Sequence, residues 1–305
     1  MARTAGMLFP GQGSQFIGMG KDYYDAFPEA RALYRDANAA LGFDITALSF
    51  SGDMEELTRT RNAQPAILLH SMVVLSVLSS RGITPAVVAG HSLGEFSALV
   101  AAGVFGPLDA LKIVRRRGEL MYDAGVARPG TMAAIIGLDD AVVDVCVREA
   151  GGVVVVANYN SPSQVAISGD VDAVERACAL CKERGAKRAL PLPVSGAFHS
   201  PLMEPAVGEF RDFLAGFETG PLRVDWVANV TGEVVRDASR VVDLLSRQLS
   251  SPVQWTRSMR AFAQRPVGAV YEVGPGAVLA GLMKRIVEGA NVITLSACDA
   301  LPAVP

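Results

Sequence analysis

Apolar residues in this chain of 305 residues occur both as short runs and as helical repeats. Runs of strand length lie at residues 6–9 and 86–89, and Gly or Pro residues bound them. Apolar residues three and four positions apart predict helices over residues 28–41, 65–81 and 107–123. Strands that alternate with helices in this way are typical of a mainly parallel sheet with helices on both faces.

The middle of the chain differs, because its elements follow the order βαββαβ. We expect strands at 132–138, 153–158, 164–168 and 187–193, and helices at 140–150 and 171–184. This is the ferredoxin-like order. The sequence therefore predicts a small ferredoxin-like subdomain at residues 129–194, inserted into a large α/β domain made of residues 1–128 and 195–305. The large domain resumes with a helix after Pro201, strands near 224–229 and 269–273, and a closing helix at 277–288.

The segment Gly90-His91-Ser92-Leu93-Gly94 joins an apolar run to a helical stretch at 95–102. A strand, a sharp turn with serine at its apex and then a helix form the setting of a nucleophile elbow, as in α/β-hydrolase-like domains. Glycines flank the turn because side chains there would collide where strand and helix approach. The segment predicts an acyl-serine enzyme with Ser92 as nucleophile, and an ordinary βα turn is the alternative.

A serine hydroxyl needs a general base, most often histidine, and the chain has three histidines. His70 lies in an apolar stretch and is predicted to belong to the core. His91 lies inside the elbow, where it lines a pocket more readily than it accepts the Ser92 proton. His199 follows the last strand of the small subdomain, in a loop rich in Gly, Ser and Pro. It is the remaining candidate, and an exposed loop histidine is the alternative.

Acyl transfer also requires hydrogen-bond donors for an oxyanion. One donor in an elbow is the backbone N–H after the nucleophile, here that of Leu93, and the other comes from a different strand-end loop. The turn Gly11-Gln12-Gly13 follows the first strand and is the natural source. It lacks the spacing and lysine of a phosphate-binding loop and the final glycine of a dinucleotide-binding loop.

Three consecutive arginines, at positions 115–117, lie in the helix expected at 107–123. At 100° per residue Arg117 falls on the apolar side, whereas Arg116 and Lys112 fall on the polar side. A buried arginine requires an anion or a cluster of carbonyl groups as partner. The carboxylate of a ligand and an internal Asp or Glu are equal alternatives.

Composition excludes few classes of function. The net charge of −3 gives no electrostatic reason to expect nucleic acid or an anionic membrane as partner. We expect a cytoplasmic protein, because the apolar runs are shorter than a bilayer span and no secretory leader is evident. The four cysteines fit free thiols. Cys178 and Cys181 lie within an expected helix without a second Cys/His pair, which argues against a metal site.

Seven segments, in order between residues 6 and 290, resemble one family. They are Gly11-Gln12-Gly13-Ser14-Gln15, Gln64-Pro65-Ala66, Gly90-His91-Ser92-Leu93-Gly94-Glu95, Arg117-Gly118-Glu119-Leu120-Met121, Asn160-Ser161-Pro162, Ala197-Phe198-His199-Ser200 and Val273-Gly274-Pro275-Gly276. Together these segments resemble malonyl-CoA:acyl carrier protein transacylases. That family includes the enzyme of fatty-acid synthesis and discrete acyltransferases that act in trans on polyketide synthases.

The resemblance implies a Ser–His dyad and two half-reactions. Ser92 would attack the thioester of malonyl-CoA while His199 takes its proton, and the phosphopantetheine thiol of an acyl carrier protein would then accept the malonyl group. The backbone N–H groups of Gln12 and Leu93 would form the oxyanion hole. The carbonyl of Ser251 would orient the histidine.

The resemblance also implies how the acyl group is selected. Arg117 matches the arginine that binds the free carboxylate of malonate, and Phe198 matches the bulky ring of malonyl-selective members. Met121, His91 and Asn160 are further expected substrate-binding residues. We expect no bound cofactor or metal, a monomer, and an acidic carrier protein that approaches basic side chains. The candidate docking residues are Lys182, Arg184, Lys187, Arg188, Lys284 and Arg285.

Two other functions remain open at this point. The first is an acyl hydrolase that clears acyl chains from carrier proteins, although such relatives tend to lack the arginine. The second is a docking subunit without catalytic activity, which the presence of Ser92 and His199 disfavours. The sequence does not distinguish a carrier protein of fatty-acid synthesis from one of polyketide synthesis.

Overall fold

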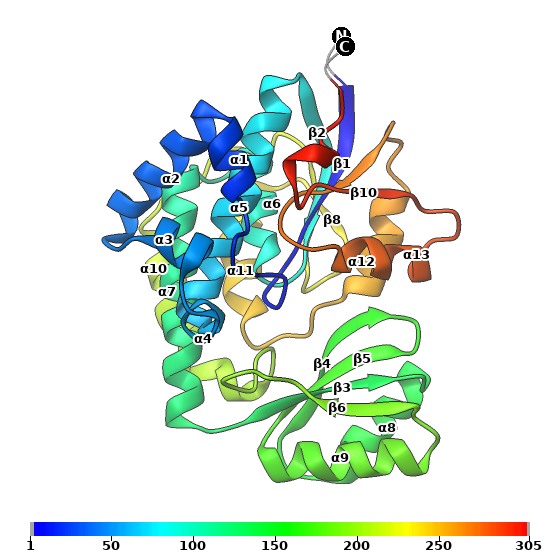
Figure 1. Cartoon of the computed structure of the whole chain (residues 1–305). Coiled ribbons are helices and arrows are strands. Elements are labelled where there is room, and N and C mark those ends of the chain that lie inside the picture. Colours follow the sequence, from blue (N-terminus) through cyan, green and yellow to red (C-terminus); the bar gives the residue numbers. More distant parts are fainter. Residues whose placement is uncertain (1–2, 304–305) are drawn as a thin grey trace.

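The computed structural model describes residues 3–303 and contains two sheets, one above the other in Figure 1. The larger sheet has six strands in the order β10-β9-β1-β2-β7-β8. These strands are β1 (Arg3–Phe9), β2 (Ile83–Gly90), β7 (Asp225–Val227), β8 (Val234–Val235), β9 (Val270–Glu272) and β10 (Val292–Thr294). Every neighbouring pair is parallel except β7 and β8. The expected α/β-hydrolase-like domain with a mainly parallel sheet is confirmed.

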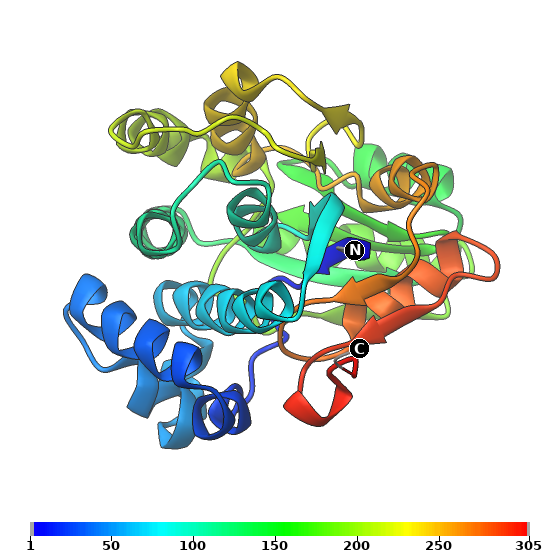
Figure 2. The ribbon, with the colours of Figure 1, turned by 90° about the horizontal axis from the view of Figure 1, so that it is seen from above.

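Helices cover both faces of this sheet (Figure 2), which is why its central strands are apolar at nearly every position. Met7 and Phe9 face the core beneath α5 (Thr60–Ser80), α6 (Gly94–Ala101) and α7 (Pro107–Ala127). Leu8, between them, faces α12 (Trp255–Ala263) and α13 (Val278–Ile286). Alternate side chains of β1 therefore supply two separate cores.

Further helices complete the large domain. They are α1 (Lys21–Ala26), α2 (Pro28–Leu41), α3 (Ile45–Ser51), α4 (Met54–Thr58), α10 (Glu204–Ala215), α11 (Val241–Gln248) and the short 3₁₀ turns Pro201–Met203, Ala238–Arg240 and Cys298–Ala300. The helix predicted at 28–41 has those bounds, and the one at 107–123 extends to Ala127.

Helix α5 begins at Thr60, five residues before the expected start at Pro65. A proline inside a helix leaves the carbonyl four residues earlier without its N–H donor, and here that carbonyl belongs to Arg61. The Arg115 side chain on α7 donates to this oxygen at 3.1 Å. Pro65 resembles a helix start because it has no N–H to donate to this carbonyl. A contact between two helices supplies the missing donor, so the helix continues through Pro65.

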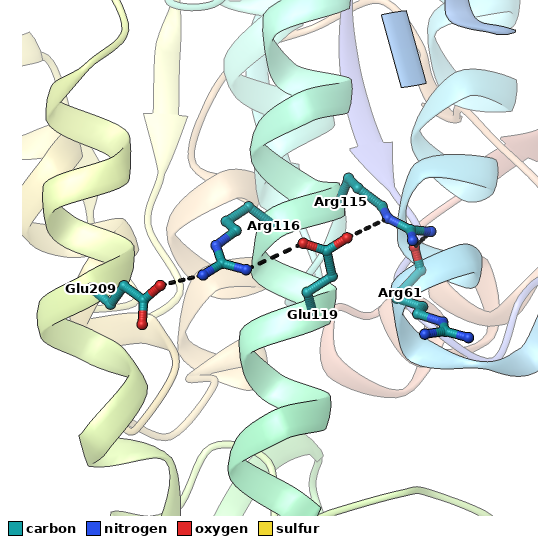
Figure 3. A network of polar contacts seen from close by, with 5 residues as sticks. All are labelled: Arg61, Arg115, Arg116, Glu119 and Glu209. Carbon is teal, nitrogen blue, oxygen red and sulfur yellow. Dashed lines mark hydrogen bonds and ion pairs between the residues drawn. The ribbon is translucent and has the colours of Figure 1, made fainter. Parts of the chain in front are cut away.

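Figure 3 shows how this contact extends across the helical layer. Glu119 accepts from Arg115 at 2.7 Å and from Arg116 at 3.3 Å, and Arg116 also pairs with Glu209 on α10. The ion pairs join α7 to α10, and the hydrogen bond from Arg115 to the Arg61 carbonyl joins α7 to α5. None of these side chains lines the pocket described below.

The smaller sheet is antiparallel, in the order β4-β5-β3-β6. Its elements are β3 (Thr131–Ile136), α8 (Asp140–Ala150), β4 (Val154–Ser161), β5 (Gln164–Gly169), α9 (Val171–Glu183) and β6 (Arg188–Pro191). The predicted ferredoxin-like order is confirmed. The sheet faces the large domain and the two helices lie outside (Figure 1), over a core of their own. The boundaries 128/129 and 194/195 stay our proposal for the domain division.

Cys181 belongs to the core of the small subdomain, whereas Cys178 is half-buried.

Helix α5 corrects the expectation that no apolar stretch reaches bilayer length. It has 21 residues and a mean hydropathy of 1.5 over an 18-residue window, enough by length and composition to cross a membrane. However, 78% of that window is buried inside the structure, as in the core helix of a globular protein.

His70 on α5 lies in the core, as predicted, and neither of its ring nitrogens has a hydrogen-bond partner among the described residues. Burial lowers the pKa of His70 to about 4, and the charge of Asp22 opposes this shift. The unfolded chain binds a proton at this residue near its ordinary pKa of about 6.5. Stability is therefore lost as the pH falls from about 6.5 to about 4.

We predict that His70→Leu makes the protein less sensitive to acid. Between pH 7.5 and pH 5 the wild type should lose about 2 kcal/mol more unfolding free energy than the variant, because only the wild type has this buried imidazole to protonate. Urea denaturation at both pH values measures the difference. Equal losses in the two proteins would show that His70 does not couple stability to pH.

Candidate active site

The turn at Ser92 connects the end of β2 to the start of α6 through very close backbone contacts. A Cβ atom on Gly90 would lie 1.9 Å from the carbonyl group of Gly94. A Cβ atom on Gly94 would lie 2.0 Å from the carbonyl oxygen of Phe9, at the end of β1. The glycines that the sequence placed at these positions therefore allow strand and helix to approach. Ser92, at the apex, adopts φ of 50°.

Ser92 and His199 are 107 positions apart in the sequence but lie within hydrogen-bond distance. Ser92 Oγ is 2.8 Å from His199 Nε2. His199 is buried, and its backbone N–H donates to Leu249 at 3.1 Å. Its Nδ1 lies 2.8 Å from the carbonyl oxygen of Gln248. With the proton on Nδ1, the Nε2 lone pair faces the serine hydroxyl, which is the geometry of a general base.

The orienting carbonyl corrects the expectation for Ser251. The hydrogen bond goes to Gln248, at the end of α11, and Ser251 is only the lesser of two backbone groups that raise the pKa of the imidazole. The bend between α11 and α12 brings both carbonyls near the ring. Sequence spacing does not show which of the two points at Nδ1.

Burial and a neighbouring cation keep His199 neutral. Burial, followed by the charge of Arg117, lowers the pKa of His199 to about 3, and the Gln248 carbonyl opposes this shift. At neutral pH the ring is therefore free to accept a proton.

Arg117 is fully buried on α7, as helical geometry predicted. Its guanidinium donates to Gln64 Oε1 at 2.9 Å, Gln248 Oε1 at 2.7 Å and Ser92 Oγ at 3.2 Å. In the part of the chain that the structure describes, none of its hydrogen bonds reaches a carboxylate. Burial lowers the pKa of Arg117 to about 9, while Glu95 opposes this shift, so the group stays cationic at neutral pH. Of the two alternatives, the geometry favours the carboxylate of a ligand.

A pocket of ≈ 410 Å³ opens beside these groups, between the two sheets. Ser92, His199 and Arg117 line it together with the predicted Gln12, Met121, His91, Phe198 and Asn160. His91 Nε2 lies 2.8 Å from Asn160 Oδ1, which ties the elbow to the small subdomain. Leu93 is buried behind Ser92 and does not line the pocket with its side chain.

Sequence reasoning gave no role to four polar residues around the dyad: Gln64, Glu95, Asn229 and Gln248. The first two lie in segments that carry the resemblance, but nothing in their residue type assigned a task. Gln248 had a detectable signal, because it continues the buried stripe of α11 at Val241, Leu244 and Leu245. An amide at a core position requires polar partners. Asn229 follows a strand of only three residues and had no such signal.

Comparisons with known proteins match almost the whole chain. A family model described as "Acyl transferase domain" matches residues 7–301. The malonyl CoA-acyl carrier protein transacylase of Bacillus subtilis (strain 168) is 46% identical, over 95% of this chain and 92% of that protein. The enzyme of the same name from Escherichia coli (strain K12) is 46% identical, over 97% of each chain.

This chain belongs to the malonyl CoA-acyl carrier protein transacylase family. Solved structures agree. An acyl carrier protein S-malonyltransferase from Vibrio cholerae superposes with a TM-score of 0.94 at 43% identity, covering 98% of each chain. A malonyl-transacylase in complex with a type II PKS acyl-carrier protein superposes with a TM-score of 0.93 at 41% identity, covering 98% of this chain and 97% of that one. The resemblance inferred from the sequence is confirmed.

The basic side chains considered for carrier docking are all exposed in this transacylase. Two of them have partners, because Arg184 pairs with Glu149 and Arg285 on α13 donates to Gln164 on β5. Arg285 thus connects the large domain with the small subdomain at one side of the pocket.

We predict that acylation of this transacylase is nearly independent of pH between 5 and 7. A general base with an ordinary pKa near 6.5 would lose about 25-fold in its neutral form over that interval, whereas His199 stays neutral. Single-turnover acylation by malonyl-CoA, with circular dichroism to confirm folding at each pH, measures this. A rate that falls in proportion to an imidazole of pKa 6.5 would contradict the burial argument.

Proposed function

We propose that Ser92 carries the malonyl group from malonyl-CoA to the phosphopantetheine thiol of an acyl carrier protein. The observation that carries the proposal is the position of Arg117, a buried cation 3.2 Å from the nucleophilic oxygen and without a carboxylate partner among residues 3–303. A malonyl group on Ser92 ends in a carboxylate that a guanidinium binds through two parallel hydrogen bonds.

In the first half-reaction Ser92 Oγ forms a bond to the thioester carbon while His199 Nε2 takes the hydroxyl proton. The oxyanion accepts hydrogen bonds from the backbone N–H groups of Gln12 and Leu93. The C–S bond then breaks, and coenzyme A leaves as a thiol with the proton from His199. The products are free coenzyme A and a malonyl ester on Ser92.

The second half-reaction follows the same path in reverse with a new thiol. His199 takes the proton of the phosphopantetheine thiol, and the sulfur attacks the ester carbon in the same oxyanion hole. Ser92 leaves and recovers its proton from His199. Because no net proton or electron is exchanged, the chain's own residues suffice for both steps, and malonyl-CoA and the carrier thiol act only as substrates.

An acyl hydrolase is the alternative, and Arg117 argues against it. An enzyme that clears assorted acyl chains gains nothing from a buried cation placed for one carboxylate. We propose that the enzyme is cytoplasmic. Malonyl transfer measured on a panel of carrier proteins from fatty-acid and polyketide synthesis would identify the acceptor.

We predict that Ser92→Ala abolishes covalent labelling by malonyl-CoA, as measured by intact-protein mass spectrometry. Arg117→Ala should lower kcat/KM for malonyl-CoA by about 100-fold, because two charge-assisted hydrogen bonds to the substrate are lost. The rate with acetyl-CoA, which has no free carboxylate, should fall far less.

The matched control is Arg116→Ala, one position along the same helix. Arg116 pairs with Glu119 and Glu209 outside the pocket, so its loss removes a positive charge but no substrate contact. An Arg117→Ala enzyme that keeps its preference for malonyl over acetyl would sink the assigned role. Label on a residue other than Ser92 would exclude the acyl-serine.

A further inference from the structure

Ser92 holds a backbone conformation that its residue type disfavours. Its φ of 50° lies in the left-handed region, which glycine adopts easily and other residues adopt rarely. Such a conformation persists only where surrounding contacts impose it. The flanking glycines make the turn possible, but they do not hold it in place.

Backbone hydrogen bonds hold the residues next to Ser92, and Gln248 Nε2 donates to the Ser92 carbonyl at 2.9 Å. Two further contacts come from the side chain of Asn229, which lies just after β7 and is fully buried. Its Oδ1 accepts from the backbone N–H of Ser92 at 2.8 Å. Its Nδ2 donates to the carbonyl oxygen of Gly90 at 2.6 Å. One planar amide therefore bridges the two backbone groups on either side of His91 and closes the turn.

Asn229 is itself held by its backbone. Its N–H donates to Glu95 Oε1 at 2.7 Å, and its carbonyl accepts from the N–H of Gln254 at 2.9 Å. Glu95 lies in the first turn of α6, the helix that begins at the elbow. Its other carboxylate oxygen accepts from Gln248 Nε2. The turn, the helix and the asparagine thus form a closed ring of hydrogen bonds.

We propose that Asn229 is a positioning residue for the nucleophile and that Glu95 anchors it. The inference rests on the proposed role of Ser92 and adds what directs its hydroxyl. By fixing the N–H of Ser92 and the carbonyl of Gly90, the amide sets the direction of Ser92 Oγ toward His199 and leaves the next N–H, that of Leu93, directed at the oxyanion. Asn229 touches neither substrate nor the reacting atoms.

The amide of Asn229 supplies one acceptor and one donor at these two points. An ionised aspartate presents an acceptor to the Gly90 carbonyl, where a donor is needed. A protonated aspartic acid, in contrast, has one hydroxyl donor and one carbonyl acceptor and reproduces the pattern of asparagine. Burial raises the pKa of such a carboxyl group, so protonation occurs within a range that enzyme assays can reach.

The test compares Asn229→Ala, Asn229→Ser and Asn229→Asp with the wild type. Two rates are measured per folded molecule: single-turnover acylation by malonyl-CoA, and covalent labelling by a small neutral sulfonyl fluoride that makes no use of Arg117. We expect Asn229→Ala to slow both rates by the same factor, about 30- to 100-fold, because the hydroxyl is misdirected. Since substrate contacts are intact, the change should appear in kcat, with KM within about threefold.

Asn229→Ser keeps a hydroxyl that can serve only one of the two backbone groups, and an intermediate rate is expected. Asn229→Asp should be slow at pH 8 and approach the wild-type rate toward pH 5. The ionisable groups around the elbow, namely Glu95, His91, His199 and Arg117, are common to both proteins. Dividing by the wild-type profile therefore removes their wild-type contribution, and the remaining pH dependence reports the new carboxyl group together with its coupling to Glu95. Recovery by protonation is not expected of a residue that only adds stability.

Asn38→Ala is the matched control. Asn38 on α2 also makes several side-chain hydrogen bonds, to Asp44 and Thr46, but it does not line the pocket. Its loss should lower the melting temperature without changing either rate per folded molecule.

Two results would overturn the proposal. One is an Asn229→Ala enzyme that reacts at the wild-type rate, and the other is an Asn229→Asp enzyme that stays slow at every pH. Failure of the proposed function would look different, because the sulfonyl fluoride would still label Ser92 in the wild type while malonyl-CoA would not.

Discussion

The catalytic geometry depends on one close crossing of backbones, where the ends of β1 and β2 meet the start of α6. The crossing leaves no room for a side chain at Gly90 or Gly94, since a Cβ at either would come within about 2 Å of backbone atoms. Because the helix approaches so closely, Ser92 is lifted above the sheet in a left-handed conformation. This contact makes possible the turn that carries the proposed nucleophile and the N–H that follows it, and the side chain of Asn229 bridges that turn.

Electrostatics in the pocket follow from what surrounds Arg117. A buried guanidinium needs acceptors, and here the neutral amides of Gln64 and Gln248 serve. The carboxyl group of Glu95 accepts from Gln248, which therefore lies between it and Arg117. The cation is thus solvated by the protein but not neutralised by direct contact. Burial lowers the pKa of His199, the charge of Arg117 lowers it further, and the base therefore stays unprotonated. In the proposed mechanism, one buried cation therefore both selects a carboxylated acyl group and helps to keep the general base neutral.

Large parts of this molecule could be predicted from local pattern. Helix α2 follows from periodicity, residues 6–9 of strand β1 from their apolar run, the glycines of the elbow from sterics, and the burial of Arg117 from helical geometry. Strand β1 begins at Arg3, three residues before the apolar run. Where prediction failed, a distant contact had replaced a local one. Pro65 resembles a helix start because it breaks the hydrogen bond to Arg61, but Arg115 repairs that break from another helix.

The sequence by itself determined which chemical groups are present and which local shapes they adopt: an elbow with Ser92, a histidine in the loop after the small subdomain, and an arginine on an apolar face. Only the tertiary structure decided which of these groups meet. The backbone carbonyl that orients His199 belongs to Gln248 rather than Ser251, and Asn229 bridges the turn from the loop after β7. The physical reason is that a hydrogen bond between distant segments forms only when its angle is favourable and its two atoms are placed to within about an ångström. Periodicity and spacing describe a single element and do not contain that information.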